Sequence, residues 1–169
     1  MTDKEEIKDG LVEEFYDNGQ LESRGNYKDG IQNGLHETFY ENGQLMVRTN
    51  YKNGKKDGLE ETFYENGQLR TRYNYKNGNR DGLFEEYYEN GQLERRTNYK
   101  NGELDGLQEW FYKNGQLKSR VNYKDGKRED GLYEGYHENG QLYIRENYKN
   151  GEPDGLWEYF YKEGNLTMT

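Results

Sequence analysis

The feature that most constrains this chain is a repeat of 24 residues. The dipeptide Gly-Leu returns at this spacing along the chain, apart from one step of 25 residues where Glu129 is inserted. The shared pattern is D-G-L-x-E-x-[FYW]-Y-E-N-G-Q-L-x-x-R-x-N-Y-K-N-G-x-x, in six complete copies and a seventh that ends at GNLTMT. Such regularity indicates one supersecondary unit stacked on the next. We expect a tail over 1–8 and a single repeat domain over 9–169, with repeats that start near residues 9, 33, 57, 81, 105, 130 and 154.

Each repeat holds two short runs rich in aromatic residues, and each run ends on Asn-Gly or Asp-Gly. Asn-Gly accepts positive φ at both central positions of a type I′ turn, so it is a strong hairpin signal. We expect a two-residue type I′ turn at Asn66 and Gly67, and a slightly longer connection at the second Asn-Gly of the repeat. The glycine and tyrosine content of each repeat argues against helices. The sequence therefore predicts an all-β fold: an elongated, single-layer antiparallel sheet of about seven hairpin repeats.

A turn at Asn66 and Gly67 also fixes a register, which places Tyr64 opposite Leu69. The same rule puts a glutamate opposite an arginine in all six complete repeats. Exposed cross-strand ion pairs contribute about 0.2–1 kcal/mol each, so this ladder specifies register more than it stabilises. The predicted structural pairs are Glu13–Arg24, Glu37–Arg48, Glu61–Arg72, Glu85–Arg96, Glu109–Arg120 and Glu134–Arg145.

Side chains alternate across a strand, so the two faces of the sheet should differ. One face should carry Leu59, Glu61 and Phe63. The other should carry constant rows of tyrosine and leucine, with the most variable positions between them. These variable positions predict a surface that binds a partner, although their aromatic residues would equally thicken a thin core. The predicted partner-binding residues are Glu60, Phe84, Glu86, Trp110, Tyr133, Tyr143, Trp157 and Tyr159.

The excess of acidic over basic residues argues against some classes of binding partner. Lys and Arg number 24 against 33 Asp and Glu, which gives a net charge of −9. This acidity argues against direct binding to nucleic acid and against docking on anionic lipid. The 15% aromatic content argues against disorder, and the absence of cysteine excludes disulfides. No apolar run is long enough for a transmembrane helix and no signal sequence is visible, so we expect a cytoplasmic protein.

The sequence offers no pattern typical of catalysis or of a cofactor. The two histidines, His36 and His137, lie in different repeats. The segment 124–131, KDGKREDG, has the composition of a calcium loop but lacks its alternating ligands. Neighbouring glutamates such as Glu85 and Glu86 should point to opposite faces. We therefore expect no enzyme activity, no metal and no cofactor.

The segments Asn-Gly-Gln-Leu and Lys-Asn-Gly-x-x-Asp-Gly make this repeat closely resemble the MORN-variant repeat (membrane occupation and recognition nexus) of bacterial proteins. The resemblance covers nearly the whole chain. It implies an elongated stack of β-hairpins that serves as a protein-binding scaffold. Many bacterial members are assigned to the YwqK-like antitoxin family, which implies neutralisation of a partner toxin by contact.

These observations favour a non-catalytic inhibitor, either an antitoxin or immunity protein or a phage-type inhibitor. Its partner would be a basic toxin or nuclease, because an acidic aromatic face complements a basic groove. Two alternatives stay open: a carbohydrate- or cell-surface-binding module, and a membrane-associated scaffold like other MORN proteins. Open sheet ends also present edge strands through which copies of the chain could associate.

Overall fold

The computed structural model describes residues 9–164 and 166–168, so the tail predicted over 1–8 lies outside the described residues. The chain divides into two compact units, one that ends at Asn79 and one that begins at Arg80. They are named here the N-terminal unit and the C-terminal unit, and each is described by itself. The single domain over 9–169 stays a prediction.

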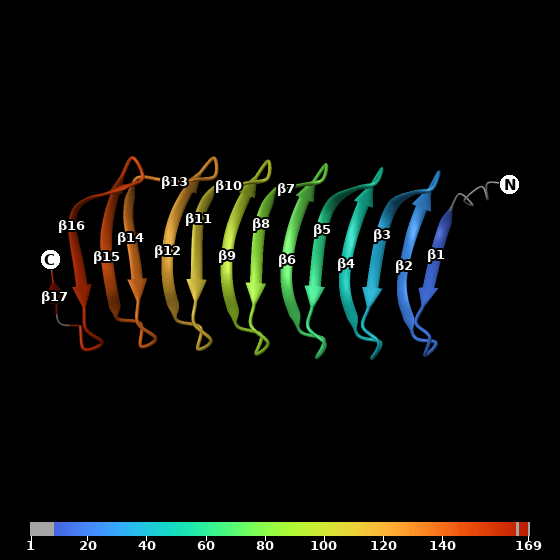
Figure 1. Cartoon of the computed structure of the whole chain (residues 1–169), viewed down its shortest axis with the longest axis horizontal. Coiled ribbons are helices and arrows are strands. Elements are labelled where there is room, and N and C mark those ends of the chain that lie inside the picture. The colour runs from blue at the N-terminus through green and yellow to red at the C-terminus, as the bar shows by residue number, and fades with distance from the viewer. Residues whose placement is uncertain (1–8, 165, 169) are drawn as a thin grey trace. The chain divides into compact units, whose positions relative to one another are not determined.

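Both units consist of antiparallel strands, and the described residues contain no helix. Within each unit the strands lie side by side in chain order, without a second layer over them (Figure 1). The predicted all-β, single-layer hairpin architecture is therefore confirmed in each unit. The N-terminal unit contains β1 (Gly10–Phe15), β2 (Leu21–Lys28), β3 (Ile31–Phe39), β4 (Leu45–Lys52), β5 (Lys55–Phe63) and β6 (Leu69–Lys76), and β7 (Asn79–Arg80) includes the boundary. The C-terminal unit contains β8 (Gly82–Tyr87), β9 (Leu93–Lys100), β10 (Glu103–Leu104), β11 (Gly106–Phe111), β12 (Leu117–Lys124), β13 (Lys127–Arg128), β14 (Gly131–Tyr136), β15 (Leu142–Lys149), β16 (Glu152–Phe160) and β17 (Leu166–Met168).

The loop at the first Asn-Gly of the repeat has three residues, so the predicted two-residue type I′ turn is wrong there. Between β5 and β6, the Gly67 N–H donates to the Tyr64 carbonyl and the Tyr64 N–H donates to the Gln68 carbonyl, both at 2.8 Å. Of the loop residues, only Gly67 has a positive φ, 82°. This is a type I turn followed by a left-handed glycine. The Asn66 Oδ1 accepts the Gln68 N–H at 2.9 Å, a local bond that holds asparagine in the turn without positive φ.

The extra loop residue is offset by a bulge close to the tip. Phe63 pairs with Leu69, whereas Glu61 pairs with Arg72 as predicted, because one further residue of β6 is left unpaired between them. The predicted pairing of Tyr64 with Leu69 is therefore wrong, but the interior register is confirmed. Two local irregularities cancel, and the side chains of the interior keep the predicted faces.

The type I′ turn occurs at the second Asn-Gly instead, where a longer connection was expected. Asn77 and Gly78 both have positive φ, 51° and 89°. This turn also bonds to the beginning of β5, the strand before β6. The Asn77 N–H donates to the Asp57 carboxylate at 3.1 Å, and the Gly78 N–H donates to the Lys56 carbonyl at 2.8 Å. In the same way Asp9, Asp57, Asp81 and Asp130 each accept the backbone N–H of a turn residue 20 positions further along the chain.

Constant residues of the repeat bond to the next repeat. In the N-terminal unit the Tyr40 hydroxyl donates to the Phe63 carbonyl at 2.8 Å. In the C-terminal unit Tyr88 makes the same bond to the Phe111 carbonyl at 2.8 Å. Because these bonds satisfy backbone groups of the neighbouring hairpin, they explain why the same residue types return every 24 residues.

The Glu–Arg ladder is confirmed and extends further than predicted. All six predicted pairs lie directly opposite each other. Arg72, for example, donates from Nε and Nη2 to Glu61 at 3.2 and 3.1 Å. Arginines also bond to the glutamate of the following hairpin, as Arg120 does to Glu134 at 2.5 Å. The ladder therefore joins successive hairpins as well as the two strands of one hairpin.

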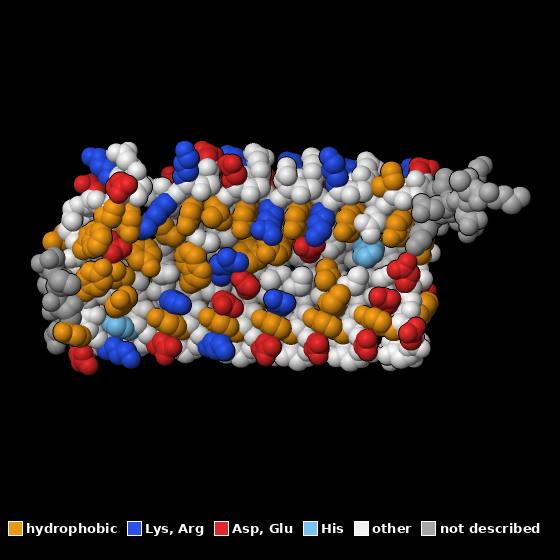
Figure 2. Space-filling model, viewed as in Figure 1, with side chains coloured by type: hydrophobic (Ala, Val, Ile, Leu, Met, Phe, Trp, Pro, Cys, Tyr) orange, Lys and Arg blue, Asp and Glu red, His pale blue; other side chains and the backbone are white. Residues whose placement is uncertain are grey.

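The opposite face, which carries the variable positions, is named here the variable face. It holds the few fully apolar buried side chains of the described residues: Phe84, Val121 and Ile144. Polar side chains such as Thr97 are buried beside them. Figure 2 shows one face of the molecule, on which hydrophobic side chains lie in rows across the strands with charged side chains between them. With so thin a core, most stability must come from contacts between neighbouring strands.

Candidate partner-binding site

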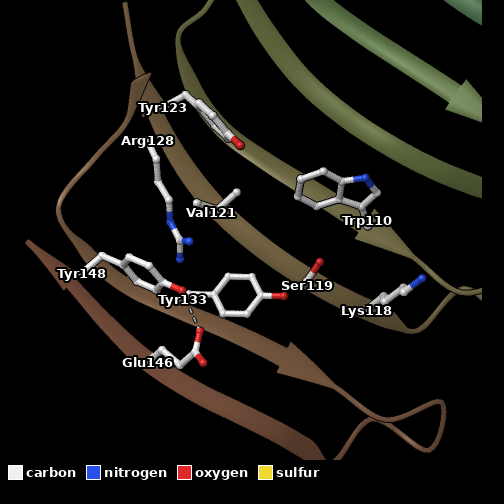
Figure 3. Close-up of a pocket in the computed structure, with 9 residues that line it drawn as sticks. All are labelled: Trp110, Lys118, Ser119, Val121, Tyr123, Arg128, Tyr133, Glu146 and Tyr148. Atoms are coloured by element: carbon white, nitrogen blue, oxygen red, sulfur yellow. Dashed lines mark hydrogen bonds between the residues drawn. The ribbon is translucent and has the colours of Figure 1, made fainter. Parts of the chain in front are cut away.

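The variable face of the C-terminal unit contains an open depression with a volume of about 550 Å³. Trp110 and Tyr133 stand on either side of it, and Val121 and Ser119 lie between them (Figure 3). The remaining lining side chains are Lys118, Tyr123, Arg128, Glu146 and Tyr148. The depression therefore combines aromatic walls with two cationic groups and one carboxylate.

The strand register explains why these side chains meet. Trp110 on β11 lies directly opposite Ser119 on β12, and Tyr133 on β14 lies directly opposite Glu146 on β15. Directly opposed residues share a face, and adjacent strands are only about 4.8 Å apart. A small residue at Ser119 leaves open the space that a larger side chain would fill.

Arg128 on β13 points into this depression. Its guanidinium carbon lies 3.4 Å from the ring centre of Tyr148 and 5.0 Å from that of Tyr133 (Figure 3). Such stacking stabilises the cation but supplies no hydrogen-bond acceptor. The Arg128 Nη2 atom is buried and has no hydrogen-bond partner among the described residues. A buried donor without an acceptor is costly and needs an explanation.

Glu146 is the carboxylate of the depression, and tyrosines hold it. It accepts the Tyr148 hydroxyl at 3.0 Å and the Tyr159 hydroxyl at 3.4 Å, and it is 7% exposed. Burial raises the pKa of Tyr159, and the neighbouring Glu146 charge and hydrogen bond raise it further. Tyr159 therefore keeps its proton at neutral pH and acts as a donor to Glu146.

The structure brings several of the predicted partner-binding residues to one face. Trp110 and Tyr133 line the depression. Beside it, Tyr143 and Tyr159 meet edge to face with ring centres 6.2 Å apart. Tyr143 and Trp157 are 46% and 36% exposed, so both rings are available at the surface.

Two of the predicted residues are not displayed, and that part of the prediction is wrong. Phe84 is 1% exposed, because the Arg95 guanidinium covers its ring at 4.7 Å and the Tyr99 ring packs against it edge to face. Glu60 in the N-terminal unit is 7% exposed and is held by Lys56 and by the Thr49 hydroxyl. Long side chains at neighbouring positions, such as Arg95 and Lys56, therefore determine which variable positions are buried.

Glu86 is also engaged within the chain. Its carboxylate forms an ion pair with Arg95 at 2.9 Å, and its side chain is 28% exposed. The predicted structural residues Asn66 and Gly67 do form the hairpin tip, in the three-residue loop described above.

The sequence prediction missed Arg128, Glu146 and the tyrosines Tyr123 and Tyr148. Both tyrosines belong to a constant row, so they were interpreted as architecture alone. One signal points to Arg128: it stands immediately before the inserted Glu129, at the single irregular step of the repeat. The inserted residue breaks the 24-residue spacing, and such a break indicates a local departure from the regular repeat structure.

Other chemistry is sparse over the residues that the structure describes. Two smaller hollows lie at hairpin tips of the N-terminal unit, lined by Tyr16 and by carboxylates such as Glu41. His36 packs against Tyr51, and His137 bonds to the Phe160 carbonyl where other repeats have tyrosine. Residues 9–164 and 166–168 bring together no group of metal-ligating side chains, and none of them forms a helix that could span a membrane.

Comparison with known families agrees with this architecture. The family described as the MORN repeat variant matches residues 8–29, 32–53, 56–77, 80–101, 104–125 and 129–150. No curated protein matches the chain. The matched segments cover well over half of the sequence and coincide with successive hairpins. The chain therefore belongs to the MORN repeat variant family and is a β-hairpin repeat scaffold.

Proposed function

We propose that this scaffold is a non-catalytic inhibitor that binds an enzyme through the variable face of its C-terminal unit. The observation that carries the proposal is the depression between Trp110 and Tyr133, which offers aromatic surface on an otherwise polar sheet. Tryptophan and tyrosine supply much of the affinity in protein interfaces because they bury a large area at small entropic cost.

The charge of the chain supports a basic partner. A net charge of −9 attracts a basic groove and speeds association at low ionic strength. Enzymes that act on nucleic acid present such grooves, since they contact phosphates. A basic toxin or nuclease neutralised by contact in the cytoplasm is the partner class that this charge favours, and it makes the antitoxin assignment a specific form of the proposal.

The experiment is capture by the tagged chain from a lysate of the source organism, at low and at high salt, followed by assay of the captured enzyme. We expect an enzyme that is retained at low salt, released at high salt and inhibited by the purified chain. Trp110→Ala should lose it, whereas Phe15→Ala, which removes a 58% exposed ring in the N-terminal unit, should retain it. Circular dichroism of both variants checks that the sheet is intact.

Two outcomes would overturn the proposal. An enzyme that binds the chain but keeps full activity would make the protein a scaffold without inhibitory function. Retention on cell-wall or membrane material, with nothing captured from the cytosol, would favour the surface-binding alternatives. Sedimentation of the purified chain separately tests the predicted self-association through edge strands.

A further inference from the structure

Arg128 can be compared with the cations at the equivalent position of other repeats. A cation at this position stacks on the tyrosine of the constant row in several repeats: Lys56 on Tyr75 at 5.1 Å, Arg80 on Tyr99 at 5.4 Å and Arg128 on Tyr148 at 3.4 Å. In the N-terminal unit the carboxylate of Glu60 forms an ion pair with Lys56. The chain thus supplies the acceptor for Lys56 from the same strand.

Arg128 lacks this carboxylate because the sequence has changed at the matching position. Tyr133 occupies the place in its repeat that Glu60 occupies in the earlier one. The Tyr133 ring stacks near the guanidinium at 5.0 Å but cannot neutralise it. The buried Nη2 atom is left without an acceptor at the wall of an open depression.

Glu146 does not replace the missing carboxylate. Its oxygens accept the hydroxyls of Tyr148 and Tyr159, whereas the Arg128 Nη2 atom has no hydrogen-bond partner among the described residues. Among the described residues, the lining therefore contains one buried donor that lacks an acceptor, next to an aromatic surface at Trp110. Guanidinium groups pair best with planar carboxylates, through short charge-assisted hydrogen bonds.

We propose that this depression binds an aspartate or glutamate side chain of the protein partner on Arg128, with a neighbouring aromatic or aliphatic side chain of the partner packed against Trp110. This inference rests on the proposed function in taking the occupant to be a protein. The net acidity of the chain attracts a basic surface at long range, while Lys118 and Arg128 make the depression itself locally cationic.

A protein segment fits the lining better than an acidic sugar does. A saccharide presents many hydroxyl groups, each of which needs a partner when it is buried. Glu146 is already engaged, and the one buried donor of this lining that lacks a partner, Arg128 Nη2, belongs to a guanidinium that matches a carboxylate. The aromatic walls fit the apolar side chain that would flank it.

The test uses the full chain labelled with nitrogen-15 and two capped peptides, acetyl-Gly-Phe-Glu-Gly-amide and its Gln counterpart. Titration at millimolar concentration follows the indole N–H signal of Trp110. We expect the Glu peptide to shift this signal with a dissociation constant lower by about fivefold or more than that of the Gln peptide. A Gln peptide with a free C-terminus tests whether a terminal carboxylate substitutes for the side chain; if only this peptide binds, the side-chain assignment is overturned.

Three variants assign the effect to Arg128. Arg128→Gln should abolish the preference for the Glu peptide. Lys127→Gln is the matched control, because it removes the same charge from the adjacent, exposed position, and it should keep the preference. Tyr133→Glu restores the carboxylate that Lys56 has, so it should abolish the preference, whereas Tyr133→Gln removes the ring alone and should retain it.

Equal affinities for the two peptides, or a preference that survives Arg128→Gln, would overturn the proposal. So would a shift by trigalacturonate, an acidic oligosaccharide, in the absence of any peptide effect. Assays of the captured enzyme with the variants distinguish a failure of the proposed inhibitor function from a failure of the proposed carboxylate site. If Trp110→Ala loses the enzyme and Arg128→Gln retains it fully, the scaffold function stands and the carboxylate site fails.

Discussion

Replacement of Glu134 by Gln tests whether the Glu–Arg ladder stabilises the C-terminal unit. The Glu134 carboxylate accepts Arg120 Nε and Nη2 at 3.1 and 2.5 Å and the Tyr136 hydroxyl at 2.9 Å, and its side chain is only 9% exposed. Hydrogen bonds to a charged group contribute about 1.5–3 kcal/mol. The arginine is 47% exposed and partly screened by solvent, so we expect a loss of about 1.5 kcal/mol in the free energy of unfolding.

The loss should depend on pH in a defined direction. Burial alone would raise the pKa of Glu134, but hydrogen bonds from Arg120 and Tyr136 and the charges of Arg120 and Arg145 lower it below its ordinary value of 4.5. The stabilisation is complete above the unfolded-state pKa and is lost as the pH falls through the folded-state pKa. The difference between the native chain and Glu134→Gln should therefore be full at neutral pH and shrink below about pH 4.

Urea unfolding, followed by circular dichroism at neutral and acidic pH, measures both quantities. Glu158→Gln is the matched control: that carboxylate is 22% exposed and bonds to Arg145 at 3.2 Å, so about 0.5 kcal/mol is expected. Equal destabilisation by Glu134→Gln at both pH values would show that the amide packs badly, and the electrostatic reasoning would be refuted.

Three further substitutions test the thin core and the turns, each by the same unfolding assay. Phe84→Ala should cost about 3 kcal/mol because the ring is 1% exposed, whereas Phe15→Ala, at 58% exposed, should cost under about 1 kcal/mol; similar losses would contradict the burial of Phe84. Gly25→Ala should cost about 1–3 kcal/mol because the new methyl group would meet the His36 ring, and His36→Ala in the same chain should restore most of it; no rescue would place the strain elsewhere. Gly67→Ala should cost about 1 kcal/mol, since φ is 82° and the nearest atom to the new methyl group, Gln44 Oε1 at 3.1 Å, ends a flexible side chain that can move; an unchanged midpoint would argue against the left-handed conformation.

The interior register of the hairpins was predicted correctly from a turn type that is wrong. A two-residue turn places Glu61 opposite Arg72, and this pairing holds because the extra loop residue is offset by the bulge near the tip. The turn types could not be predicted from the Asn-Gly dipeptide, because the same dipeptide forms two different loops. The Asn66 side chain stabilises the three-residue loop, and the Asp57 carboxylate on β5 stabilises the tight turn at Asn77. Both contacts depend on the surroundings of the dipeptide.

The candidate site was predictable in part for a similar reason. Trp110 and Tyr133 were identified because they stand at positions that vary between repeats whose other residues are constant, and both line the depression. The same criterion also selected Phe84, which is buried, because a variable position belongs to the surface only if its neighbours leave it uncovered. Arg128 was missed because it lies outside the rows of variable positions and its significance depends on a missing acceptor.

Constant and variable positions of the repeat have different roles, and this difference indicates how such a chain acquires a binding site. Constant residues such as Tyr40 and Tyr88 bond to the neighbouring repeat, so their replacement would disturb the stack. The variable positions between these rows make no such constant bond. There, a glutamate at position 60 satisfies the cation of its own repeat, whereas a tyrosine at position 133 leaves the Arg128 donor open and adds an aromatic wall. One exchange of residue type thus converts a closed ion pair into a surface that selects a carboxylate, and specificity in this scaffold can be set repeat by repeat without change to the fold.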